Sequence, residues 1–220
     1  MKNTWKKNIV MGVILIALFI IYTILIQIID VKPLGLNGTD IGFYTINSWF
    51  HNLCGLNFTL YTVTDWAGLI PLFVMIAFAF LGLFQFIKRK DIKKVDLDII
   101  ILGAYYIAII IIYFIFEIVT INFRPVLING FIESSYPSST TLLVLGIMPT
   151  LTELIGRRCK FKKIKIATII FTITFSLGCV ICRLVSGVHW LTDIVGSVII
   201  ASGLFCIYKG LISYFYSNYN

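Results

Sequence analysis

The chain has 220 residues, of which 59% are hydrophobic and 13% are charged, and its mean hydropathy is +0.97. Soluble domains carry roughly 25% charged residues, so this composition excludes an ordinary soluble protein and places the chain in a membrane. The formal net charge of +8 would also suit a nucleic-acid partner, but basic residues of membrane proteins gather in cytoplasmic loops. The positions of the basic residues in the chain therefore decide between a nucleic-acid partner and cytoplasmic loops.

Hydropathy predicts an all-α fold, a single membrane-embedded domain over residues 1–220 that crosses the bilayer about six times. A transmembrane helix needs about 20 apolar residues. The first apolar run follows Lys2, Lys6 and Lys7 as in a signal peptide, but it is too long for one and lacks a small-residue cleavage site, so we expect it to be retained. In chain order, the predicted helices cover residues 8–29, 66–87, 97–119, 138–155, 164–181 and 190–208, the fourth being the shortest.

The basic residues are placed asymmetrically along the chain. Fifteen of the 18 Lys and Arg lie in the N-terminal tail, in 88–94, in 157–165 and at Lys209, which is one side of a six-span topology. The positive-inside rule then predicts that both termini are cytoplasmic and that the remaining loops are extracytoplasmic. The membrane accounts for the basic charge, and no nucleic-acid partner is predicted.

The first outer segment, Asp30 to Asp65, is long and combines aromatic with polar residues. This mixture is typical of a helix lying in the membrane interface, although simple aromatic anchoring would give the same pattern. The aromatic and imidazole side chains concerned are Trp49, Phe50, His51, Phe58 and Tyr61.

The five cysteines are odd in number and lack the paired spacing of a metal or redox site. Cys179 and Cys182 lie in or beside an apolar segment, where they are better explained as small packing residues. No metal and no cofactor are predicted.

Two arginines lie at the outer ends of apolar segments, Arg124 before Pro125 and Arg183 after Cys182. Arginine is unfavourable near hydrocarbon, so each needs a reason. Either one alone could be an interfacial anchor. A bound anion is the other explanation, because guanidinium groups hold phosphate oxygens bidentately and stay charged.

The residues that follow Arg183 favour a functional site. If a helix starts near His189, the four-residue spacing places Asp193 on the same face. A carboxylate one turn from an imidazole can accept its N–H, fix its tautomer and raise its nucleophilicity. A polar helix cap at the interface is the simpler alternative.

The segment 134–141, Ser-Ser-Tyr-Pro-Ser-Ser-Thr-Thr, opens the fourth apolar run. Proline suits the first helical turn, and hydroxyl side chains suit helix caps. The free N–H groups of a helix start there would bind an anion, although a capped helix with nothing bound fits equally well.

Together these segments resemble the type 2 phosphatidic acid phosphatase superfamily, the integral-membrane lipid phosphatases related to vanadium haloperoxidases. The family pattern is Lys, six residues, Arg-Pro; then Pro-Ser-Gly-His; then Ser-Arg, five residues, His, three residues, Asp. The corresponding residues here are Glu117, six residues, Arg124-Pro125; then Pro137-Ser138-Ser139-Thr140; then Cys182-Arg183, five residues, His189, three residues, Asp193.

The resemblance implies that His189 attacks phosphorus to form a phosphohistidine and that Asp193 orients it. It also implies that phosphoryl oxygens are held by Arg124, Arg183, Ser138 and the neighbouring Ser139. The expected partner is a membrane lipid that carries a phosphate or diphosphate.

Three motif positions depart from the family: Glu117, Thr140 and Cys182. Thr140 replaces the histidine that protonates the leaving group, and a threonine hydroxyl cannot be a general acid near neutral pH. Glu117 replaces a phosphate-binding lysine, which should weaken anion binding unless the carboxyl is protonated or paired with an arginine.

The resulting hypothesis is an enzyme that hydrolyses a lipid phosphate or polyprenyl diphosphate at the extracytoplasmic face. Without a general acid, a diphosphate is the better substrate, because its phosphate leaving group needs no proton. His51 or Glu133 could supply a proton if either reaches the site. The alternative is a degenerate homologue that binds or moves an anionic lipid without hydrolysing it.

Overall fold

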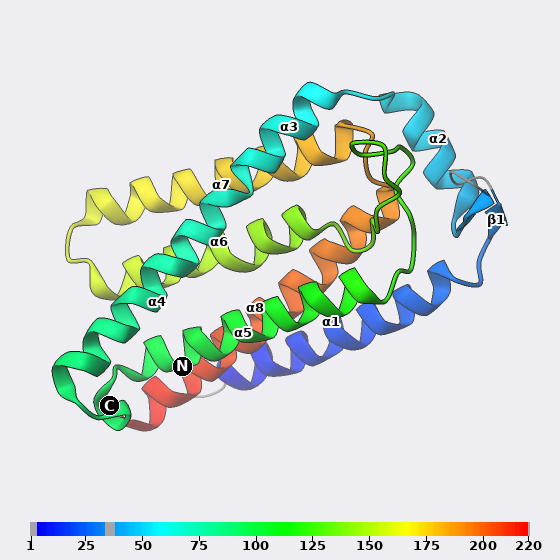
Figure 1. Ribbon diagram of the computed structural model, residues 1–220. Helices are drawn as coiled ribbons and strands as arrows, with labels where there is room; N and C mark the ends of the chain where they lie inside the picture. The colour runs from blue at the N-terminus through cyan, green and yellow to red at the C-terminus, as the bar shows by residue number, and fades with distance from the viewer. Residues whose placement is uncertain (1–3, 34–37, 220) are drawn as a thin grey trace.

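The computed structural model describes residues 4–33 and 38–219, so Lys2 lies outside the described residues. Within this part of the chain, six helical segments are long and apolar enough to cross a membrane. They pack as an elongated bundle with both chain ends near the same end (Figure 1). This confirms the predicted all-α bundle. The spans are α1 (Thr4–Ile26), α3 with α4 (Phe58–Ala67 and Leu69–Arg89), α5 (Leu97–Ile118), α6 (Ser139–Arg158), α7 (Lys162–Val185) and α8 (Leu191–Tyr219).

The first outer segment contains the predicted extra helix, α2 (Tyr44–Cys54), which carries Trp49, Phe50 and His51. Phe58 and Tyr61 were wrongly placed with it, because they belong to α3, which leads into α4. The junction residue Gly68 has helical dihedrals (φ −59°, ψ −17°), so the second span begins eight residues earlier than predicted. The remaining elements are a short antiparallel pair, β1 (Lys32–Pro33) with β2 (Asp40–Ile41), and a 3₁₀ turn at Ile92–Lys94.

The last helix extends to Tyr219, well beyond the predicted end at 208. Its final turns are more polar than a typical span, so hydropathy alone ends the helix too early. They continue to pack on α1, where Tyr214 meets Trp5 edge to face with ring centroids 4.8 Å apart. Tertiary packing therefore sets this helix end.

Glycines let α1 and α8 approach closely along their length (Figure 1). A Cβ atom added at Gly12 of α1 would lie 2.8 Å from the carbonyl oxygen of Gly203, and one added at Gly210 would lie 2.5 Å from Ile9 Cγ1. Small residues at helix interfaces are the usual means of close packing in membranes, where no hydrophobic driving force brings helices together.

A buried asparagine ties α2 to the beginning of α8. The Asn47 side chain is fully buried; its Nδ2 donates to the Gly42 carbonyl (2.8 Å) and to Thr192 Oγ1 (3.0 Å). Its Oδ1 accepts from the Thr192 backbone N–H at 3.2 Å. The start of α8 is thereby fixed from the outer segment.

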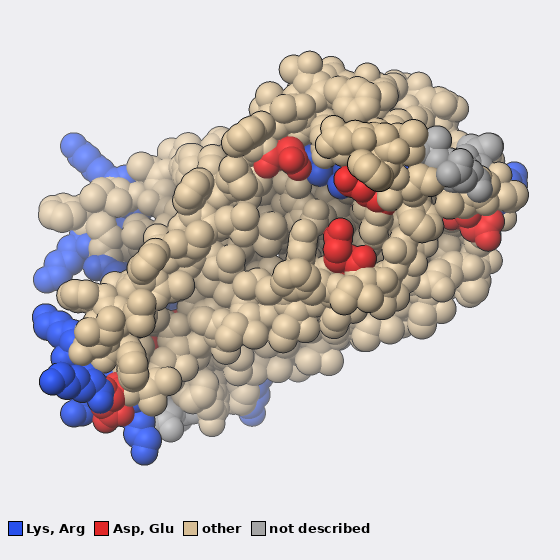
Figure 2. All heavy atoms as spheres, viewed as in Figure 1, with Lys and Arg blue, Asp and Glu red and all other residues tan. Residues whose placement is uncertain are grey.

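Lys and Arg side chains gather at one end of the bundle, whereas acidic side chains surround a hollow nearer the other end (Figure 2). The hollow lies where the connection between α5 and α6 meets the connection between α7 and α8 (Figure 1). The uneven placement of Lys and Arg along the sequence therefore puts most of them at one end of the folded molecule.

We predict that Gly12→Val destabilises the fold. The valine would press on the α8 backbone, and overpacking of this kind costs about 1–3 kcal/mol. The melting temperature of the purified protein in detergent should fall by several degrees. Gly178→Val is the matched control, because a Cβ at Gly178 meets no atom within 4 Å. Equal melting temperatures for the two variants would contradict the role given to this contact.

Candidate active site

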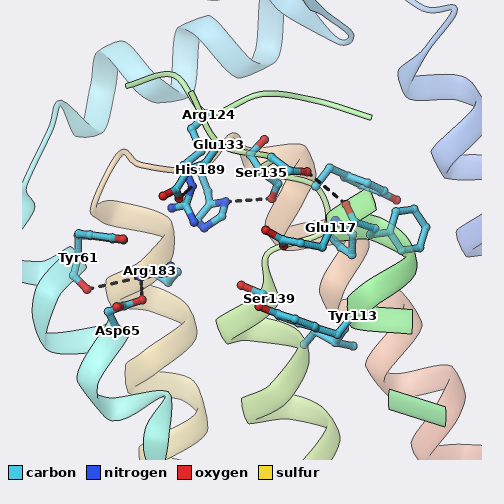
Figure 3. Close-up of a pocket in the computed structure, with 15 residues that line it drawn as sticks. Tyr61, Asp65, Tyr113, Glu117, Arg124, Glu133, Ser135, Ser139, Arg183 and His189 are labelled. Carbon is cyan, nitrogen blue, oxygen red and sulfur yellow. Dashed lines mark hydrogen bonds and ion pairs between the residues drawn. The ribbon is translucent and has the colours of Figure 1, made fainter. Parts of the chain in front are cut away.

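The hollow is a cavity of about 280 Å³, close to the lower end of ordinary ligand pockets. Its walls come from α3, α5, the 119–138 connection, the start of α6, the end of α7 and the loop before α8 (Figure 3). The residues lining it are Tyr61, Asp65, Tyr113, Phe116, Glu117, Arg124, Glu133, Ser134, Ser135, Tyr136, Pro137, Ser139, Leu142, Arg183 and His189.

His189 is held from one side only. Its Nδ1 lies 3.1 Å from the Ser135 carbonyl oxygen and 3.5 Å from Asp193 Oδ2. Both neighbours are acceptors, so Nδ1 carries the proton and Nε2 carries the lone pair. Nε2 is buried without a hydrogen-bond partner among the described residues. The imidazole is thus neutral and has a free lone pair beside the cavity.

Burial lowers the pKa of His189 well below its ordinary value, and the positive charges of Arg124 and Arg183 lower it further. A lowered pKa means that the imidazole stays unprotonated at neutral pH and takes a proton only in more acidic solution. The lone pair on Nε2 of His189 therefore stays free at neutral pH.

Asp193 is fully buried in the first turn of α8. Its Oδ2 accepts from the Trp190 backbone N–H at 2.8 Å, as an acidic residue does when it closes a helix N-terminus. Asn122 Nδ2 lies 3.5 Å from Oδ1. Asp193 thus combines the capping role with the predicted position beside His189.

A β-hairpin in the 119–138 connection brings Arg124 and the Ser135 carbonyl to the cavity. Ser135 N–H donates to the Asn122 carbonyl at 2.9 Å, and Ile128 and Phe131 exchange backbone hydrogen bonds of 3.0 and 2.9 Å. The turn residues Asn129 and Gly130 have φ of 50° and 83°. Asn-Gly is a strong hairpin signal, and it would have found this element from the sequence.

Both arginines are buried and each has a carboxylate partner at the cavity mouth. Arg124 Nε lies 3.1 Å from Glu133 Oε2, without the alignment of a hydrogen bond, and Arg183 Nη1 lies 3.6 Å from Asp65 Oδ1. The two guanidinium groups lie over the Tyr61 ring, 5.7 and 4.7 Å from its centroid. Arg124 Nη1 and Arg183 Nε find no hydrogen-bond partner in the described ranges.

The Pro-Ser-Ser-Thr segment is only partly at the cavity. Ser139 lines it, whereas Ser138 is not among the lining residues. Ser138 is fully buried, and its carbonyl accepts from Ser197 Oγ at 2.9 Å. Thr140 points elsewhere as well: a Cβ added at Gly68 would lie 3.2 Å from its Cγ2. The position of the family histidine thus faces the junction of α3 and α4.

Of the other two positions that depart from the family pattern, one lies away from the cavity and one lines it. Cys182 is half-buried and does not line the cavity. Glu117 lines it, is exposed at its mouth, and forms no ion pair with either arginine in the part of the chain that the structure describes. An ion pair with an arginine therefore does not neutralise the negative charge of Glu117.

Of the two suggested proton donors, only Glu133 reaches the cavity. The His51 ring instead packs against Trp190, with centroids 5.5 Å apart, and His51 is not among the lining residues. Its place in the outer segment gave no indication of this contact.

The residues that sequence reasoning did not assign to the site include Tyr61 and Asp65 on α3, Tyr113 on α5, Asn122 in the hairpin and Ser135, whose carbonyl faces His189. Tyr113 precedes Glu117 by four residues, so helical spacing could have predicted that they share a face. Nothing local connects Asp65 with Arg183, which lies 118 positions later.

The bundle of six candidate membrane-spanning segments thus carries one cavity that is lined by a buried histidine and two arginines. Residues 119–217 match the family model described as the PAP2 superfamily. Over these residues the chain is similar to this superfamily, that of the type 2 phosphatidic acid phosphatases.

The fold is similar to the crystal structure of a transmembrane PAP2-type phosphatidylglycerolphosphate phosphatase from Bacillus subtilis. The TM-score is 0.61, with 18% sequence identity over 92% of this chain and 96% of that chain. At this identity the likeness concerns the fold alone. No curated protein matches the chain in sequence.

We predict that His189 titrates well below the ordinary histidine value of about 6.5. The measurement is a pH titration of ¹³Cε1-labelled histidine by NMR in detergent, with His51→Gln to assign the two resonances. Arg124→Gln should raise the pKa of His189, because it removes one of the positive charges that lower it. A value of 6.5 or above in the unmodified protein would show that the ring is not buried as described.

Proposed function

We propose that this protein is an integral-membrane lipid phosphatase that hydrolyses a lipid phosphate or polyprenyl diphosphate through a phosphohistidine. The observation that carries the proposal is the unpartnered Nε2 of His189, buried beside Arg124 and Arg183 at one cavity. A buried lone pair next to two guanidinium groups suits an electrophile that carries negative charge, and a phosphoryl group is one.

In the proposed first step, Nε2 attacks phosphorus and the bond between phosphorus and the leaving-group oxygen breaks with its electron pair. Arg124 and Arg183 would stabilise the charge on the remaining phosphoryl oxygens. The Ser135 carbonyl and Asp193 would stabilise the positive charge that develops on the imidazole. Water would then attack the phosphohistidine, releasing inorganic phosphate and restoring His189.

The leaving group limits the substrate. Thr140 cannot serve as a general acid, and its side chain packs toward Gly68. Loss of a general acid costs about 10²–10⁴-fold. A diphosphate ester would lose less, because its leaving phosphate is stable without a proton.

A second candidate function is binding or movement of an anionic lipid without hydrolysis. The displaced Thr140 and the unpaired, exposed Glu117 favour it, since both weaken the site as a catalyst. The buried pairing of His189 with Asp193 favours the enzyme, because lipid binding has no evident need for an oriented nucleophile.

We predict phosphate release from a polyprenyl diphosphate, and slower release from phosphatidic acid, by the purified protein in detergent. His189→Ala should reduce release to background because the nucleophile is gone, whereas His51→Gln should keep it. Since the pKa of His189 is lowered, activity should persist at neutral pH and fall only as the pH drops well below 6.5. Release that survives in His189→Ala would disprove the nucleophile. Lipid binding without any release would support the second candidate.

We further propose that the cavity faces the extracytoplasmic side, since the basic residues lie at the opposite end (Figure 2). In single-cysteine variants in intact cells, a membrane-impermeant maleimide should label Cys54, which ends α2, but not Cys159 between α6 and α7. Cys159 should react only after the membrane is permeabilised. The reverse pattern would place the site in the cytoplasm.

A further inference from the structure

The charges that line the cavity do not suit a simple anion. Two arginines are outnumbered by three carboxylates, Asp65, Glu117 and Glu133, and His189 is neutral. The formal charge of the empty cavity is therefore negative by one. A phosphate monoester dianion would bring two more negative charges into a confined space, which is unfavourable unless a positive charge accompanies it.

The carboxylates are not equivalent. Glu133 and Asp65 each lie within 4 Å of an arginine, whereas Glu117 has no cationic partner in the described part of the chain. Figure 3 shows Glu117 and Tyr113 across the cavity from Asp65 and Arg183. The cavity thus has a cationic side, with the arginines, and an anionic side, with Glu117.

The anionic side has the composition of an ammonium site. Glu117 lies one helical turn beyond Tyr113 on α5, and Phe116 also lines the cavity there. A carboxylate beside aromatic rings attracts alkylammonium groups through ion pairing and cation–π contact.

The phosphate position is marked independently by buried polar atoms that lack partners, His189 Nε2 and Arg124 Nη1. Because the cavity measures only about 280 Å³, a phosphate held there and a cation held at Glu117 would lie close together, as they do in a single molecule that carries both groups.

We infer that the preferred ligand is a 2-aminoalkyl phosphate, a phosphate ester with an ammonium group two carbons from its ester oxygen. The inference rests on the phosphate site of the proposed function and narrows its substrate. Two kinds of lipid carry this group, namely those with an ethanolamine phosphate headgroup and phosphorylated sphingoid bases. A polyprenyl diphosphate offers an easier leaving group, so the chemical step favours it. It also adds negative charge and no cation, so binding favours the 2-aminoalkyl phosphate.

The test compares O-phosphoethanolamine with n-propyl phosphate, which differ in one terminal group, ammonium or methyl. Their affinities for the full-length protein in detergent are measured from the shift of the His189 ¹³Cε1 resonance, and ³¹P spectra confirm that each ester stays intact. An exposed ion pair with a cation–π contact predicts roughly 5- to 10-fold tighter binding of the amine. Glu117→Gln should abolish this preference, and Glu117→Lys should reverse it. Asp40→Asn, an exposed carboxylate on β2 outside the cavity, should leave it unchanged.

Equal affinities for the two esters, or a preference that persists in Glu117→Gln, would overturn the ammonium site while leaving the phosphate site standing. If neither ester shifts His189, the proposed phosphate site itself fails, and the inference fails with it. Competition by sphingosine 1-phosphate and by lysophosphatidylethanolamine then separates the sources, because the first is a phosphate monoester and the second a diester. Failure of both lipids to displace bound O-phosphoethanolamine would overturn the assignment to a lipid.

Discussion

The imidazole of His189 joins the separate parts of this site. Its Nδ1 faces the Ser135 carbonyl of one outer connection and the Asp193 carboxylate of α8, while Nε2 faces the cavity. A buried imidazole with no partner at Nδ1 would be strongly unfavourable, so the loop from α5 to α6 must dock on the start of α8 for the ring to be buried. Asn47 supports this arrangement by hydrogen-bonding Thr192 next to Asp193.

Charge competition governs the rest of the cavity. Arg124 and Arg183 lie away from bulk water, where an isolated cation is costly, and Glu133 and Asp65 at the mouth offset part of that cost. An incoming phosphate must compete with these carboxylates for the same guanidinium groups. The pairs keep the arginines stable in the empty site and reduce its affinity for simple anions.

Of the departures from the family pattern, only Glu117 lies at the cavity. His189, Asp193 and both arginines keep the spacing of the family pattern that the sequence resembles, whereas Glu117 stands where that pattern has lysine and Thr140 where it has histidine. The first change makes one side of the cavity anionic, and the second removes the proton source. In the proposed function, both changes affect what the site can accept beside the phosphate and leave the phosphate-binding residues in place.

The sequence by itself determined the six spans, the asymmetric basic ends and the closeness of His189 to Asp193, although α8 begins at Leu191 and His189 lies in the loop before it. These features depend on the hydropathy, charge and spacing of residues within short segments, which need no distant partner. The tertiary structure alone decided that Ser139 and not Ser138 lines the cavity, that Thr140 turns toward Gly68, and that Asp65 meets Arg183. Those outcomes depend on how each helix is rotated about its axis and on how the outer connections dock. Both are set by packing between residues far apart in the chain, and a local pattern does not contain that information.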